Sequence, residues 1–335
     1  MKKEQLPGNG RSESRAENHK GALFVPEIYI TGRCNQNCLF CSVSANKPGG
    51  RKEPALSEIK NRLDQFKKLS HKIRITGGEA AVRKDFLEII KYAKSIGFET
   101  IAVESNGQKF SNLSFAEKTV QAGADDFFIS FHGHNAKLYD SMTCSPGSFT
   151  RAKQGIINLG NLGQRVSINI VITARNYKYL PEVVRLLRDK LGQSSVTLSF
   201  PIMSGELMRH RNLVPKMTDA VPYIKKALQA NSGKTKISVQ HLPFCVLGEA
   251  NKYNIWVKVQ KKTVIDNPNF VITIEPKNAH DRKDKGCAGC RYDNICYGIR
   301  EGYADFYGFG ELKPVKGKKI DDFRIFFAER DSLLK

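Results

Sequence analysis

Residues 28–41 read Ile-Tyr-Ile-Thr-Gly-Arg-Cys-Asn-Gln-Asn-Cys-Leu-Phe-Cys, a short apolar run followed by three cysteines. The cysteines are Cys34, Cys38 and Cys41, with three residues and then two between them. Thiolates this close together on one loop can bind three irons of a [4Fe–4S] cube and leave the fourth iron without a protein ligand. Catalytic metal sites keep such an open position. The spacing therefore suits a catalytic iron–sulfur cluster. The alternative is a zinc loop, although structural zinc usually takes four protein ligands and only three are present locally.

The apolar run is the first of six that alternate with amphipathic helical stretches. Each is short, rich in β-branched residues and expected to be apolar on both faces, as a buried parallel strand is. Six β–α units in succession predict an α/β fold whose parallel sheet is open or curled into a partial (β/α)6 barrel of the TIM type. The expected strands are 28–31, 73–76, 101–104, 127–131, 167–173 and 196–200.

Polar and glycine residues follow the first three strands, where a barrel gathers its chemistry. Cys34 follows the first strand, Gly77–Glu79 follows the second, and Ser105–Asn106 follows the third. These segments are therefore expected to meet at one mouth of the barrel.

After residue 200 the β–α rhythm stops. We expect a helix over 219–230, strands over 255–259 and 270–274, and a Cys-rich, Gly-rich tail over 286–310. This pattern predicts a small Cys-rich α+β extension after the barrel. The expected division is a disordered polar leader at 1–20, a barrel core at 21–205, a connecting helical segment at 206–240 and a C-terminal domain at 241–335.

The composition of the 335 residues indicates a cytoplasmic protein. No apolar run approaches the roughly 18 residues that a membrane span requires, and the N-terminus lacks the apolar stretch of a secretory signal. In the cytosol thiols stay reduced, so eight cysteines in clusters indicate metal rather than disulfides. The net charge of +21 permits a nucleic-acid partner, but a basic solvated surface accounts for it equally.

The cysteine spacing, the aromatic Phe40 and the sequence Gly77-Gly78-Glu79 resemble the radical S-adenosylmethionine (SAM) family from about residue 24 onward. The resemblance implies that SAM binds the open iron and that an electron from the cluster cleaves it. The products are methionine and a 5′-deoxyadenosyl radical, which removes a hydrogen atom from the substrate. The glycines let backbone approach the ligand, and Glu79 is expected to accept from the SAM ammonium. Ala80 replaces the family's usual proline.

The same resemblance assigns further SAM contacts to strand ends: Ser105, Asn106, Ser130, Asn169 and Arg175. Arg175 suits a carboxylate, but it equally suits a surface loop. Ser105 and Asn106 equally suit an ordinary turn before Gly107. His132 near the same mouth is either structural or in contact with substrate.

A second group of cysteines lies near the C-terminus. Cys287, Cys290 and Cys296, with Cys245 as a fourth ligand, would close a second [4Fe–4S] cluster. The arrangement is similar to the auxiliary-cluster extensions called SPASM and twitch domains. A zinc ribbon is the competing interpretation. Cys144 remains, as a free thiol or a catalytic one.

The resemblance implies an enzyme that needs a reductant such as flavodoxin or ferredoxin and acts on a peptide or a small metabolite. The alternatives are a GTP cyclase of molybdenum cofactor synthesis and a nucleoside- or RNA-modifying enzyme. The cyclase is less favoured because the sequence ends Asp-Ser-Leu-Leu-Lys, without that family's pair of glycines. A non-enzymatic alternative is a zinc-containing nucleic-acid-binding protein.

Overall fold

The main sheet has nine strands, in the order β7-β6-β5-β4-β3-β2-β1-β8-β9. The computed structural model describes residues 25–46, 53–231, 235–258, 263–267, 270–274 and 281–333, so the expected leader lies outside the described residues. Seven strands pair in parallel and in sequence order. They are β1 (Glu27–Tyr29), β2 (Lys72–Thr76), β3 (Thr100–Ser105), β4 (Asp126–Ser130), β5 (Arg165–Val171), β6 (Ser195–Ser199) and β7 (Lys236–Gln240).

This order confirms the α/β fold and the partial barrel, with one parallel strand more than the six expected. The seventh strand, β7, lies within the segment expected to be a helical connection and pairs with β6. Its sequence alternates Lys-Ile-Ser-Val-Gln, and only Ile237 and Val239 are apolar. Because the strand is not a continuous apolar run, it does not match the pattern of a buried strand. Its alternation of apolar and polar residues does predict a half-buried strand.

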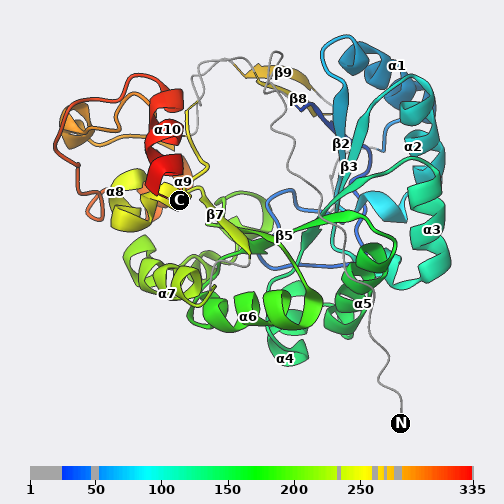
Figure 1. The fold of residues 1–335 in the computed structure, drawn as a ribbon, viewed down its shortest axis with the longest axis horizontal. Coiled ribbons are helices and arrows are strands. Elements are labelled where there is room, and N and C mark those ends of the chain that lie inside the picture. The colour runs from blue at the N-terminus through cyan, green and yellow to red at the C-terminus, as the bar shows by residue number, and fades with distance from the viewer. Residues whose placement is uncertain are drawn as a thin grey trace.

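Helices cover the outside of the sheet (Figure 1). The apolar stripes that predict them, such as Ile59, Leu63 and Phe66, are buried against the strands as expected. The helices are α1 (Leu56–Lys67), α2 (Phe86–Ser95), α3 (Leu113–Gln121), α4 (Ala136–Thr143), α5 (Ser148–Asn161), α6 (Leu180–Leu191) and α7 (Met217–Gln229). Among the described residues, no helix is long and apolar enough to cross a membrane.

The strands are not apolar on both faces, contrary to expectation. In β2, Ile73 and Ile75 are fully buried beneath the helices, whereas Arg74 and Thr76 face the other way and remain partly exposed. Strands β4, β5 and β7 alternate in the same way. The curved sheet encloses a cavity lined by charged, polar and apolar side chains. The barrel therefore has a lumen of mixed polarity.

Two further strands extend the sheet beyond β1. Strand β8 (Thr263–Asn267) pairs in parallel with β1, and β9 (Phe270–Ile274) pairs antiparallel with β8. The expected strand at 270–274 is confirmed. The strand expected at 255–259 is wrong for its described part, since residues 255–258 are not in a strand. Their backbone is hydrogen-bonded to β7 only at Ile255, next to an isolated bridge between Asn254 and Val239.

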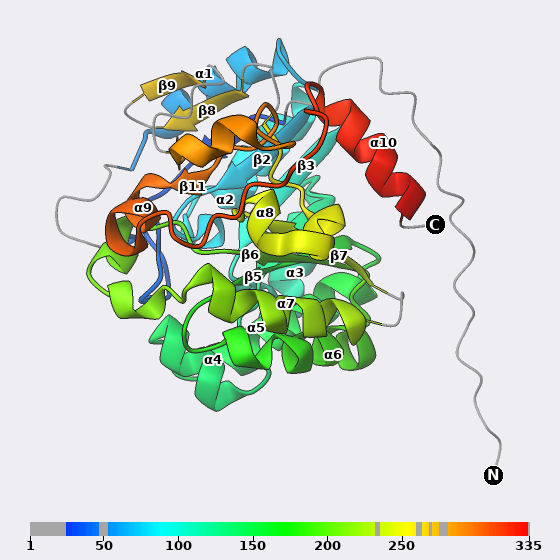
Figure 2. The ribbon, with the colours of Figure 1, turned by 90° about the vertical axis from the view of Figure 1, so that its left-hand side faces the viewer.

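The C-terminal residues form a small module beside β7 and α7 (Figures 1 and 2). It contains α8 (Phe244–Leu247), the antiparallel pair β10 (Asp281–Arg282) and β11 (Ile299–Arg300), α9 (Glu301–Tyr307) and α10 (Phe323–Leu333). Its own apolar core is small and consists of Phe244, Val257, Ile295, Ile320 and Phe326. A core of this size contributes little stability by itself. Other residues of the module, among them Leu247, Ile299 and Tyr303, are buried in the main core, so the module also packs against the barrel.

Two glycines on α5 offer a matched test of the packing behind the barrel mouth. A Cβ built on Gly155 would lie 2.2 Å from the carbonyl oxygen of Gly107, whereas one on Gly160 meets nothing within 4 Å. We expect Gly155→Ala to destabilise the protein by about 1–3 kcal/mol through overpacking. Gly160→Ala should stabilise it by about 0.5–1 kcal/mol through helix propensity. Thermal midpoints under anaerobic conditions measure both, and equal midpoints would contradict this packing.

Candidate active site

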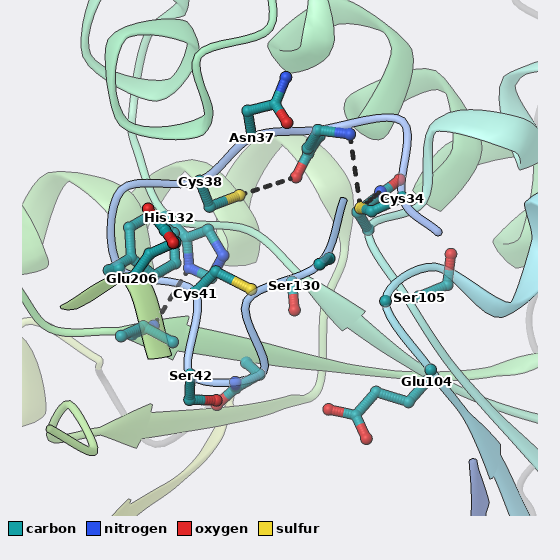
Figure 3. Close-up of a pocket in the computed structure, with 18 of the residues that line it drawn as sticks. Cys34, Asn37, Cys38, Cys41, Ser42, Glu104, Ser105, Ser130, His132 and Glu206 are labelled. Carbon is teal, nitrogen blue, oxygen red and sulfur yellow. Dashed lines mark hydrogen bonds between the residues drawn. The ribbon is translucent and has the colours of Figure 1, made fainter. Parts of the chain in front are cut away.

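The three cysteines of the first loop line one cavity of about 200 Å³ at the carboxyl ends of the strands. Their sulfur atoms face a common space (Figure 3). The structure brings most of the residues predicted for SAM to the same cavity: Phe40, Gly77, Gly78, Ser105, Asn106, Ser130 and Asn169. The strand ends therefore meet at one mouth, as their positions in the sequence indicate.

The cysteine loop is held by hydrogen bonds from outside it. The Asn46 side chain accepts from the Cys34 N–H at 2.8 Å and donates to the Cys34 carbonyl at 2.7 Å. The Leu39 N–H bonds to the carbonyl of Met142 at the end of α4, and the Cys41 carbonyl accepts from Glu206 N–H at 2.8 Å. These contacts fix the loop without using the thiols, which stay available as ligands.

Gly77 and Gly78 bring β2 against the cysteine loop. A Cβ on Gly77 would lie 2.7 Å from the Thr31 carbonyl oxygen, and one on Gly78 would lie 2.6 Å from that of Arg33. In this close approach the Gly78 N–H donates to the Thr31 carbonyl at 2.8 Å. The glycines are thus required by contact between two loops, in addition to lining the cavity.

Glu79, expected to accept from the SAM ammonium, is hydrogen-bonded within the protein. Its side chain is 1% exposed and does not line the cavity. The carboxylate accepts from the Ser105 hydroxyl at 2.8 Å, the Asn106 N–H at 2.6 Å and the Ala81 N–H at 3.1 Å. Burial raises its pKa, and these donors lower it. Glu79 therefore positions the loop after β3, with Ser105 and Asn106 facing the cavity.

The remaining predicted residues divide between the cavity and the surface. Arg175 is exposed and donates to the Ser141 carbonyl at 2.9 Å, outside the cavity. His132 lines the cavity, and its Nδ1 accepts from the Val171 N–H at 3.1 Å. Burial lowers the pKa of His132 to about 3, so the ring is neutral, with its proton on Nε2. Its edge contacts the Phe40 ring at 4.8 Å between centroids.

Sequence reasoning missed several residues that line the cavity, and two of them are polar residues close to the thiols. Glu206 comes from the loop after β6, and Gln36 lies between the cysteines. The Gln36 side-chain oxygen accepts from the Cys38 thiol at 3.2 Å, while its buried Nε2 has no hydrogen-bond partner among the described residues. Position after a strand end could have indicated Glu206. Nothing in the sequence distinguishes Gln36 from other loop residues.

The thiols of the loop suit an iron–sulfur cube. Burial raises the pKa of Cys34 to about 12 and that of Cys38 well above its usual value, so without a metal these thiols stay protonated. The Cys34 sulfur accepts from the Gln36 N–H at 3.4 Å, a donor that would stabilise a thiolate ligand.

Among the described residues, no three His, Cys, Asp or Glu side chains converge as ligands of a single metal ion do.

The second group of cysteines also comes together. Cys245, at the start of the C-terminal module, lines one small cavity with Cys287, Cys290 and Cys296. Backbone N–H groups of Val315 and Gly298 donate to the sulfurs of Cys290 and Cys296, each at 3.3 Å. The structure thus places Cys245 beside the three C-terminal cysteines, as the expected fourth ligand would lie. Cys144, in contrast, is exposed at the end of α4.

The family model described as Radical SAM superfamily matches residues 28–187, which include the cysteine loop and strands β1–β5. Residues 28–187 form a radical SAM domain. The resemblance to this superfamily, inferred from the sequence, is thereby confirmed, and SAM and a [4Fe–4S] cluster are the cofactors of the superfamily. The residues of the first cavity fit both.

Curated relatives share this part of the chain. A 7,8-dihydro-6-hydroxymethylpterin dimethyltransferase from Methanocaldococcus jannaschii is 35% identical over 36% of this chain and 25% of its own. A probable GTP 3′,8-cyclase from Methanopyrus kandleri is 32% identical over 49% of this chain and 53% of its own length. An AdoMet-dependent heme synthase from Oleidesulfovibrio alaskensis is 30% identical over 56% of this chain and 51% of its own length. This chain thus spans between a quarter and about half of the length of these relatives.

Two solved structures share the fold at low identity. Native anSMEcpe with bound AdoMet aligns over 92% of this chain and 98% of its own, with a TM-score of 0.61 and 11% identity. Streptococcus suis SuiB bound to the precursor peptide SuiA aligns over 64% and 49%, with a TM-score of 0.51 and 15% identity. The alignment with anSMEcpe extends beyond the barrel, so it includes most of the C-terminal module.

The second thiol site generates a test of its own. In Cys245→Ala we expect the iron content to fall from about eight to about four per chain, since one of two cubes is lost. The C-terminal module should then become sensitive to protease, because its apolar core is small. Cys144→Ser is the control and should keep all of its iron. Unchanged iron in Cys245→Ala would exclude Cys245 as a ligand.

Proposed function

We propose that this chain is a radical SAM enzyme that abstracts a hydrogen atom from a peptide, or from a small metabolite, bound in the barrel lumen. One observation carries the proposal: the cavity of the three thiols adjoins the lumen. Thr76, Glu104 and Asn169 line both spaces. A substrate in the lumen would therefore lie next to the space proposed for SAM.

The bound cluster and SAM together supply a reductively generated 5′-deoxyadenosyl radical that takes a hydrogen atom from the substrate. The chain holds these groups in place. Cys34, Cys38 and Cys41 would hold three irons, and the fourth would bind SAM. The wall of Gly77, Gly78, Phe40, Ser105, Asn106, Ser130 and Asn169 would then surround SAM.

In the same proposal Glu79 is a positioning residue, because its carboxylate fixes the loop that carries Ser105 and Asn106. Neutral His132 adds no charge beside the cofactor. Arg175 has no part in binding SAM in this arrangement, since it lies outside the cavity.

The C-terminal module is proposed to be a twitch-like domain with one auxiliary [4Fe–4S] cluster on its four cysteines. The geometry of Cys245 beside Cys290 supports this, and the fold of anSMEcpe matches over nearly the whole chain. The electron for SAM cleavage would come from a cytosolic flavodoxin or ferredoxin, in a compartment that keeps these thiols reduced.

A peptide substrate is supported by the two structural neighbours. A structure of anSMEcpe contains AdoMet and the Kp18Cys peptide, and the SuiB structure contains the precursor peptide SuiA. A nucleotide is the second candidate, because curated relatives at 29–32% identity include GTP 3′,8-cyclases. A peptide fits this chain better, since the lumen contains two carboxylates and only one guanidinium among its described lining residues.

SAM cleavage tests the proposal. Anaerobically purified protein should be brown with about eight irons, and with dithionite and SAM it should form 5′-deoxyadenosine. Cys38→Ala should reduce the yield at least 100-fold, because one ligand of the catalytic cluster is lost. Chromatography of the nucleoside product measures the yield.

The matched control is Cys144→Ser, which changes an exposed thiol beyond the loop and should leave the yield unchanged. A colourless zinc protein, or an undiminished yield in Cys38→Ala, would refute the assignment.

A further inference from the structure

The barrel lumen is a cavity of about 610 Å³ below the thiols. Its walls are largely neutral: Asn169, Ser199 and Gln240 form a chain of hydrogen bonds on one side. His241 at the rim is neutral too, because burial and then the charge of Arg300 lower its pKa to about 4. The charged side chains among the described residues that line the lumen therefore lie on other strands.

Those groups are Glu27, Arg74 and Glu104, on the neighbouring strands β1, β2 and β3. Glu27 and Arg74 are register partners, and Nη1 of Arg74 donates to Glu27 at 2.9 Å. The two side chains remain 36% and 34% exposed, so the pair is open to the lumen. The guanidinium also lies 5.4 Å from the centroid of the Phe128 ring. Arg74 thus pairs with Glu27 through Nη1, while its buried Nε has no hydrogen-bond partner among the described residues.

Glu104 has much less compensation for its charge. In the described part of the chain, its one hydrogen bond comes from the Thr76 hydroxyl at 3.2 Å. Desolvation, together with the charge of Glu27, raises its pKa to about 7, although the charge of Arg74 opposes this shift. Glu79, which is fully buried, accepts from three donors. A half-buried carboxylate with one neutral donor is incompletely compensated, and a cation beside it would stabilise its charge.

We propose that the substrate places a positively charged nitrogen, a primary ammonium or a guanidinium, against Glu104 and Glu27 in the lumen. Two carboxylates and one guanidinium line the lumen, so one further positive charge would balance the charges of this group. Glu104 lines both the lumen and the thiol cavity, so the group it holds lies beside the space assigned to SAM. This inference rests on the proposed function and narrows its substrate class.

The test compares cationic probes with matched neutral ones on SAM-loaded, reconstituted protein. The probes are the capped tripeptide acetyl-Gly-Lys-Gly-amide, its norleucine analogue, free agmatine and GTP. Isothermal titration calorimetry gives each dissociation constant, and thermal midpoint and iron content verify that each variant is intact. A charged hydrogen bond in a partly buried site predicts at least about tenfold tighter binding of lysine than of norleucine.

Glu104→Gln keeps the shape and can still accept from Thr76, but it removes the charge. We expect it to abolish the preference for lysine and to leave SAM affinity within about threefold. The control is Glu88→Gln, on the outside of α2 and paired with Lys60, which should change neither. Agmatine binding better than the peptide would indicate a free amine as the source of the cation, whereas the reverse would indicate a peptide.

Four results would each overturn the inference: norleucine binding as tightly as lysine, GTP binding more tightly than both, no cation binding at all, or lysine preference surviving in Glu104→Gln. A loss of SAM affinity alone in Glu104→Gln would assign this carboxylate to the cofactor and overturn it as well. The same preparations are assayed for 5′-deoxyadenosine. Wild-type protein that cleaves SAM without preferring cations refutes this inference alone, whereas protein that does not cleave SAM refutes the proposed function.

Discussion

The close contact between the backbone after β1 and the backbone after β2 is the constraint on which this site depends. The carbonyls of Thr31 and Arg33 occupy the space that side chains at Gly77 and Gly78 would need. This contact anchors the start of the cysteine loop at the mouth of the barrel. Asn46, the end of α4 and the start of the 3₁₀ helix Gly205–Met208 then fix the rest of the loop.

A second constraint extends the mouth to the third strand. The fully buried Glu79 carboxylate accepts hydrogen bonds from Ser105, Asn106 and Ala81. Such a group is stable only when its hydrogen bonds are complete, so the loop after β3 has little freedom. Three loops are thereby held together before any cofactor binds. This preorganisation is what a site for a reactive cofactor requires.

The two cysteine sites differ in what the fold does for them. The first sits on a barrel with an extensive apolar core, which holds its loop independently of metal. The second lies in a module whose own core is small, and its four thiols come from two segments more than forty residues apart. In the proposed function, metal at the first site would add chemistry, whereas metal at the second would also add cohesion.

The sequence by itself determined the family, the alternation of strands and helices, and the grouping of cysteines. These depend on local spacing: three thiols on one loop, glycines directly after a strand, and apolar residues at helical or strand period. The stripes of α1, α2 and α6 therefore lie where the sequence indicates. Strand β7 could also have been predicted, because its apolar and polar residues alternate with a period of two.

Only the tertiary structure decided which way the polar residues face and what they meet. Arg74, Glu104 and Asn169 become neighbours of one cavity because the sheet curls, which no local pattern records. The same holds for Glu79, whose partners lie more than twenty residues away along the chain. Long-range contacts of this kind depend on how the strands pack in three dimensions, so the side-chain roles follow from the fold rather than from the motif.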